Sequence, residues 1–172
     1  EHFDTVEVNS SFYRVPSVET TKAWARRTPK DFDFSLKLYQ KFTHPEMFLK
    51  ATGGDPANLD RRDVDEFRAA IDPLAEAGKL GPLLAQFPAS FKNDPPSIAY
   101  LEWLLRAFRT YSLAVELRHR SFSENPEDAM RLLITLMILL AGAPALAQEP
   151  LFLLRPARVF DGVDPRPHEG WS

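Results

Sequence analysis

The sequence predicts an α/β fold built from parallel β/α units. Short apolar segments alternate with longer amphipathic stretches over residues 1–129, which is the order expected of strands joined by crossover helices. The length of 172 residues allows about one domain. Hydrophobic residues make up 44% and charged residues 26%, as in ordinary globular proteins, so we expect a buried core.

Four segments are predicted strands because each is rich in Val, Leu or Phe. Each is also bounded by Pro, Asp or Gly, which favour turns. The predicted strands are residues 3–9, 32–38, 80–87 and 112–118.

Two amphipathic crossover helices are predicted among these strands. Asp60 can cap the first helix, and Gly78 stands where that helix would end. Asp94 can cap the second, and Pro95 suits its first turn. Apolar residues recur at helical spacing after both caps, and we expect Trp103 to belong to the core.

Side-chain alternation separates an apolar face from a polar face in each predicted strand. Val6, Leu36 and Val115 are expected beneath the helices that cover a parallel sheet. Polar residues fall towards the carboxyl ends of the strands, where functional sites of parallel α/β barrels lie. The residues predicted to converge there are Glu7, Asn9, Lys37, Gln86, Glu116 and Arg118.

The catalytic candidates are Glu7, Glu116 and Lys37. Two carboxylates in a dry site would push one pKa up and leave a proton donor beside a base. Lys37 could form a Schiff base if it were desolvated. The alternative is a buried ion network with Arg118 that has no catalytic role.

Arginine side chains at the predicted mouth are suited to hold a phosphate or a carboxylate. Arg14, Arg118 and Arg120 are such residues, and Tyr13 lies beside Arg14; ordinary solvated charge is the alternative. Two histidines follow predicted strands, but no HxH or HExxH spacing accompanies them, so we predict neither a metal nor a cofactor. The predicted binding residues are Asn9, Tyr13, Arg14, His44, Gln86, Arg118 and His119.

The charge balance argues against a general affinity for polyanions. There are 21 Lys and Arg residues against 24 Asp and Glu residues, a net charge of −3. We therefore expect no nucleic-acid partner; the arginines at the predicted mouth make a small anionic molecule the expected partner. There is no cysteine, which excludes disulfides, thiolate nucleophiles and Cys-ligated zinc.

The sequence from Met130 onward has the layout of a secretory signal peptide. Arg131 provides a positive start, residues 132–143 are an apolar stretch too short for an ordinary membrane span, and Ala-Leu-Ala at 145–147 is typical of a cleavage site. A buried helix of the preceding domain is the alternative. The predicted division is a barrel segment at 1–129, a signal-peptide-like segment at 130–147 and an extension at 148–172.

An internal signal peptide has no targeting role unless translation starts at Met130. Our hypothesis is that two unrelated coding segments were joined, by a gene-model error or by a real fusion. The first segment would then be cytoplasmic, and the tail would be secreted or periplasmic if translated from Met130. Apart from this signal-like segment, we predict no membrane partner.

Five motifs, at 7–16 (EVNSSFYRVP), 29–37 (PKDFDFSLK), 43–44 (TH), 81–88 (GPLLAQFP) and 116–122 (ELRHRSF), resemble the YecE-like family, catalogued as domain of unknown function 72. The resemblance covers about residues 1–125 and implies a TIM-barrel-like fold but no settled activity. The family's opening strand with its Gly-Trp motif is absent, and Phe122 stands where Trp is usual. Because a full barrel has about 250 residues, we expect about four of its eight strands here, with open sheet edges that favour aggregation.

Two classes of function compete for the first segment. One is a hydrolase or lyase acting on a small anionic, phosphorylated or nucleic-acid-derived substrate, with Glu7 or Glu116 as acid or base and Arg118 as anion clamp. The other is a barrel that binds a ligand without catalysis.

The tail has a resemblance of its own. Residues 154–162 (LRPARVFDG) resemble the opening strand of secreted metal-dependent amidohydrolases. A further hypothesis is therefore the start of such an enzyme, fused by gene-model error. The metal-binding histidines of that family would lie beyond Ser172, and a simple terminal extension is the alternative.

Overall fold

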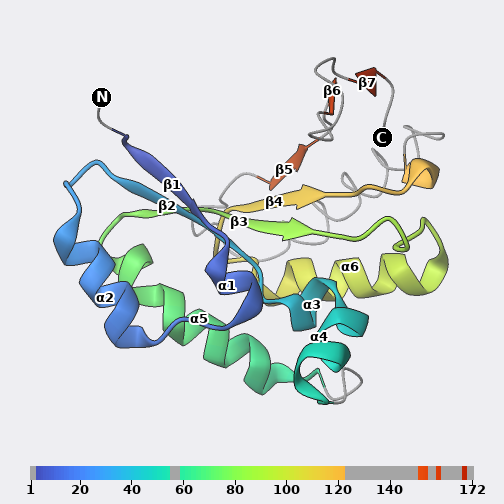
Figure 1. Cartoon of the computed structure of the whole chain (residues 1–172), viewed down its shortest axis with the longest axis horizontal. Coiled ribbons are helices and arrows are strands. Elements are labelled where there is room, and N and C mark those ends of the chain that lie inside the picture. The colour runs from blue at the N-terminus through green and yellow to red at the C-terminus, as the bar shows by residue number, and fades with distance from the viewer. Residues whose placement is uncertain (1–2, 55–58, 123–150, 155–157, 160–167, 170–172) are drawn as a thin grey trace, which may run out of the picture.

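The fold is a parallel sheet with helices packed against one face (Figure 1). The computed structural model describes residues 3–54, 59–122, 151–154, 158–159 and 168–169. Four strands lie side by side in chain order: β1 (Thr5–Val8), β2 (Asp33–Lys37), β3 (Leu80–Gln86) and β4 (Leu113–Glu116). All three pairings are parallel, which confirms the α/β class and the partial-barrel topology.

A fifth strand joins this sheet from the tail. β5 (Leu151–Leu154) pairs in parallel with β4, and β6 (Arg158–Val159) pairs antiparallel with β7 (His168–Glu169). The predicted extension at 148–172 thus contributes a strand beside the barrel segment. The stretch 130–147 lies outside the described residues, so the signal-peptide and core-helix interpretations both stay predictions.

Helices connect successive strands and cover one face of the sheet (Figure 1). They are α1 (Ser10–Tyr13), α2 (Val18–Arg27), α3 (Gln40–Thr43), α4 (Pro45–Thr52), α5 (Arg61–Glu76) and α6 (Pro95–Ala107), with a short 3₁₀ turn η2 (Arg120–Phe122) after β4. Among the described helices, none combines the length and apolar character needed to cross a membrane.

The two predicted helix starts are confirmed by their caps. The Asp60 carboxylate accepts from the backbone N–H of Asp63, whose own carboxylate accepts from the Asp60 N–H, so a capping box opens α5. Asp94 accepts from the Ser97 N–H at 2.9 Å at the start of α6. Gly78 follows α5 with a φ of 65°, a left-handed conformation that glycine adopts without steric cost.

The core lies between the helices and the outward-facing side chains of the strands. Leu36, Leu83 and Val115 are buried there together with helix residues such as Leu104. The rings of Phe42, Phe67 and Phe108 meet edge to face, with centroids 5.4 to 5.9 Å apart.

Three expectations about particular positions are wrong. Val6 is 39% exposed because β1 lies at the edge of the sheet, where cover is incomplete. Asn9 is outside the strand: its backbone is helical, it precedes α1 as the N-cap, and strand alternation therefore does not orient it. Trp103 is 37% exposed, on the rim of a surface hollow described below.

A buried lysine ties the start of β3 to the end of α2. Lys79 is 6% exposed, and its Nζ donates to the carbonyl oxygens of Ala25 at 2.6 Å and Thr28 at 2.8 Å. These carbonyls belong to the last turn of a helix, where backbone acceptors lack intrahelical partners. Nothing in the sequence pattern distinguishes Lys79 from a surface lysine.

The core makes a first prediction. Leu104→Ala should lower the free energy of unfolding by about 3 kcal/mol, because it removes a fully buried side chain and leaves a cavity. Arg106→Ala, on the exposed side of the same helix, should change it by less than about 0.5 kcal/mol, since its ion pair with Glu102 is solvent-exposed. Urea unfolding followed by circular dichroism measures both; equal effects would contradict the packing described.

Candidate functional site

A chain of four side chains runs across the carboxyl ends of three strands. The Lys37 ammonium donates to the Gln86 side-chain oxygen at 2.5 Å, and the Gln86 amide donates to Glu116 Oε2 at 2.6 Å. Glu116 Oε1 accepts from Arg118 Nε at 2.6 Å. The structure thus joins four of the predicted residues into one hydrogen-bonded array with two cations and one carboxylate.

Strand register brings these side chains together. Gln86 and Glu116 are direct neighbours across the β3–β4 pairing, and Lys37 pairs with Leu84, two residues before Gln86 on the same face. The long lysine side chain reaches that extra distance. Leu36, Ala85 and Val115 are buried on the helix side, so their sequence neighbours face the opposite side of the sheet.

Lys37 lies between opposing electrostatic influences. Burial lowers the pKa of its amino group, and the nearby Arg118 guanidinium lowers it further. Glu7 and Glu116 act in the other direction, without cancelling the decrease. The Phe12 ring also supports the ammonium, whose Nζ lies 4.6 Å from the ring centroid.

The first turn after β1 shapes this end of the sheet. The Ser11 hydroxyl lies 2.6 Å from the Val8 carbonyl oxygen and 2.7 Å from the Lys37 carbonyl oxygen, so it joins the ends of β1 and β2. Ser11 and Phe12 are both buried. Neither residue is among those predicted from the sequence, although both lie within the conspicuous Ser-Ser-Phe-Tyr run.

His44 also contacts the Phe12 ring. The two rings meet edge to face with centroids 5.0 Å apart, and His44 Nδ1 is 2.9 Å from the Thr43 hydroxyl. Burial lowers the pKa of His44, and the positive charges of Lys37 and Arg118 lower it further. His44 is therefore a neutral imidazole at pH 7.

The remaining predicted residues lie apart from the array. Glu7 is exposed and influences Lys37 only electrostatically; among the described contacts, none joins the carboxylates of Glu7 and Glu116. Tyr13 is 65% exposed, and Arg14 is exposed after α1. No described contact links Tyr13, Arg14 or Asn9 to the array, and their proposed roles stay predictions.

His119 belongs to a separate hydrogen-bonded group after β4. The backbone N–H of Ser121 donates to His119 Nδ1 at 3.1 Å, which places the ring proton of a neutral His119 on Nε2. The Ser121 hydroxyl is 2.7 Å from the same nitrogen and accepts from the Asn93 N–H at 2.9 Å. This group orders the β4–η2 connection next to Arg118.

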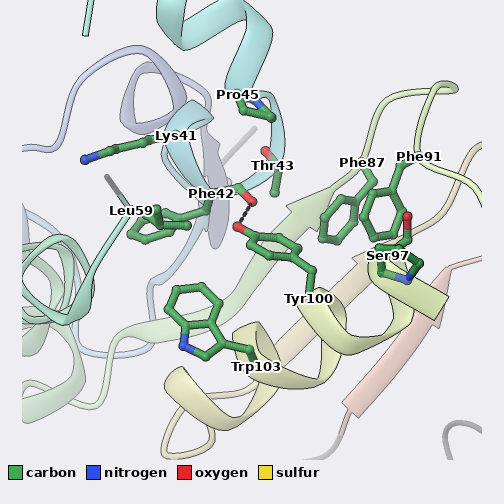
Figure 2. A pocket seen from close by; sticks show the side chains of 11 residues that line it. Lys41, Phe42, Thr43, Pro45, Leu59, Phe87, Phe91, Ser97, Tyr100 and Trp103 are labelled. Carbon is green, nitrogen blue, oxygen red and sulfur yellow. Dashed lines mark hydrogen bonds between the residues drawn. The ribbon is translucent and has the colours of Figure 1, made fainter. Parts of the chain in front are cut away.

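A mostly apolar hollow of about 530 Å³ lies on the helix side of the sheet (Figure 2). Its walls come from α3, α6 and the residues after β3. The rings of Phe87 and Phe91 stack there, with their centroids 4.2 Å apart. The Tyr100 hydroxyl donates to the Phe42 carbonyl at 2.6 Å, as the dashed line in Figure 2 shows.

In the part of the chain that the structure describes, no cluster of His, Asp or Glu is suited to hold a metal ion.

A parallel sheet covered by helices on one face, with a polar array at the carboxyl strand ends, is the arrangement of a TIM-barrel-like protein. The family model described as "Protein of unknown function DUF72" matches residues 1–143, so this chain belongs to the DUF72 family. The match continues past residue 129, and the boundary proposed there stays a prediction.

Known relatives agree with this assignment. The UPF0759 protein YunF of Bacillus subtilis is 30% identical over 125 residues, which cover 73% of this chain and 43% of YunF. The UPF0759 protein YecE of Escherichia coli K12 is 30% identical over 135 residues, covering 76% of this chain and 44% of YecE. The chain therefore spans less than half the length of these curated relatives.

Solved structures show the same fold. A DUF72 family protein of Thermotoga maritima is 36% identical, with a TM-score of 0.60 over 78% of this chain and 48% of that protein. A DUF72 family protein of Enterococcus faecalis is 25% identical, with a TM-score of 0.67 over 79% of this chain and 51% of that protein.

The lowered pKa of His44 makes a second prediction. Between that pKa and 6.5 the unfolded chain binds more protons than the folded chain, so stability is lost as the pH falls through this window. His44→Gln should remove the part of this loss of stability that comes from His44. Urea unfolding at several pH values from 7 downwards measures the free energy of unfolding of both proteins. If that free energy falls equally with pH in the two proteins, the environment assigned to His44 is contradicted.

Proposed function

We propose that the carboxyl-end array binds a small anionic substrate, phosphorylated or carboxylated, and that the protein is a hydrolase or lyase acting on it. Arg118 would bind the anion, and Glu116 would transfer protons. The observation that carries this proposal is the bonded array itself, which holds two cations and one carboxylate at the end of a parallel sheet where barrel enzymes place their sites.

Arg118 is suited to recognise the anion. Its side chain is 49% exposed and uses Nε for Glu116. The two Nη groups, which have no partner among the described contacts, remain for a phosphate or carboxylate, whose oxygens match the guanidinium fork. Glu116 prevents free rotation of the guanidinium, so less conformational entropy is lost on binding.

Glu116 is suited to proton transfer because it is held in place. Its side chain is only 18% exposed, and both of its oxygens accept a hydrogen bond, one from Gln86 and one from Arg118. A fixed carboxylate within reach of a bound substrate meets the geometric requirement for a general base. Gln86 thus acts as an orienting residue between Glu116 and Lys37.

The anion site makes a third prediction. Arg118→Gln should weaken the binding of inorganic phosphate about tenfold, because a hydrogen bond to a charged group contributes about 1.5 kcal/mol. Arg109→Gln is the matched control, since Arg109 is exposed after α6 and precedes β4, at the opposite end of the sheet. Isothermal titration at low ionic strength measures both; equal affinities for the two variants would refute the assignment of Arg118.

Glu116 distinguishes an enzyme from a binding protein. Against a panel of phosphate esters and phosphorylated hydroxy acids, Glu116→Gln should lower turnover at least about a hundredfold, the usual contribution of general acid–base catalysis. Phosphate affinity should persist. Loss of stability without loss of turnover would instead assign the array to a structural ion network, and ligand binding without turnover in the unaltered protein would assign it to a non-catalytic barrel.

A further inference from the structure

We infer that Lys37 is a covalent amine nucleophile, and that the substrate is an aldehyde or ketone that carries a phosphate or carboxylate group. This inference rests on the proposed anion site and adds the reacting group of the substrate. It also favours lyase chemistry over hydrolysis, because an imine draws electrons from the neighbouring carbon–carbon bond.

The direct partner of Lys37 is neutral. Its Nζ donates to an amide oxygen of Gln86, and among the described contacts no carboxylate touches it. The partly buried ion pair between Lys41 and Asp63, at 2.7 Å, shows the usual arrangement, in which a carboxylate holds the ammonium in its charged form. The Gln86 amide orients the Lys37 amino group without the full electrostatic attraction that a carboxylate would exert on its ammonium form.

The surroundings of Lys37 also favour a reactive amine. Two side chains of the array, Gln86 and Glu116, separate Lys37 from Arg118. The positive charge of Arg118 disfavours a second positive charge on Lys37. The buried Phe12 ring lies on one side of Nζ and leaves little room for water there. The lowered pKa of Lys37 is consistent with this geometry and increases the fraction of neutral amine at a given pH.

The step balances without an oxidant or reductant. The Nζ lone pair attacks the carbonyl carbon, a carbon–nitrogen bond forms, and the carbonyl electron pair moves to oxygen. Both hydrogens of the amine leave with that oxygen as water when the carbon–oxygen bond breaks, which produces the imine. Arg118 would hold the anionic group and so direct the carbonyl towards Lys37.

Pyridoxal phosphate and pyridoxal are suitable probes, because both carry an aldehyde and only the first carries a phosphate. The full chain is treated with each, reduced with borohydride, and mapped by peptide mass spectrometry. Lys37 should be modified several-fold faster than the exposed Lys30, and pyridoxal phosphate should be preferred over pyridoxal. Modification of Lys30 and Lys37 at equal rates would overturn the inference without need of any variant.

Two variants separate this inference from the anion site. Arg118→Gln should abolish the preference for pyridoxal phosphate; any change in the intrinsic reactivity of the amine affects both probes and cancels in their ratio. Lys37→Arg should lose the adduct while phosphate binding persists, because Arg118, which binds the anion, is unchanged. Selective Lys37 labelling without a phosphate preference would refute the anion site alone, whereas phosphate binding without selective labelling would refute the nucleophile alone.

Discussion

Burial of the outward-facing strand side chains is the constraint on which the candidate site depends. Leu36, Ala85 and Val115 lie beneath the helices, and each is followed in the sequence by one member of the polar array. A slip of one residue in any strand would exchange its two faces and expose core side chains. The hydrophobic core therefore determines the direction of Lys37 and its partners, although it contacts none of their polar groups.

The candidate site also depends on a local irregularity in the pairing of β2 with β3. Phe34 pairs with Leu80, but Leu36 pairs with Leu83, so β3 contains one extra residue near Pro82. Proline has no N–H to donate to a neighbouring strand, and the Ser35 hydroxyl donates to its carbonyl oxygen at 2.7 Å. The extra residue changes the phase of β3, so Leu80 packs on the core while Gln86 faces the array.

The array itself balances rigidity against reactivity. Gln86 separates Lys37 from Glu116, so the lysine is held by a hydrogen bond without a direct ion pair. The α1 turn supports the same lysine from the other side, through the Ser11 hydroxyl at the backbone and the Phe12 ring at the ammonium. The contacts that order these side chains are thus compatible with an amine of Lys37 that reacts and an Arg118 guanidinium that meets an anionic ligand.

The sequence alone determined the α/β class, the four strands, the two capped helices and the polar ends of the strands, because alternation and capping act between residues close in the chain. Only the tertiary structure decided which polar residues meet. Gln86 and Glu116 touch because of strand register, Phe12 supports Lys37 because the α1 turn folds back on β2, and Lys79 is buried because the end of α2 lies beside it. Such contacts join residues far apart in the chain, and local pattern contains no information on that pairing.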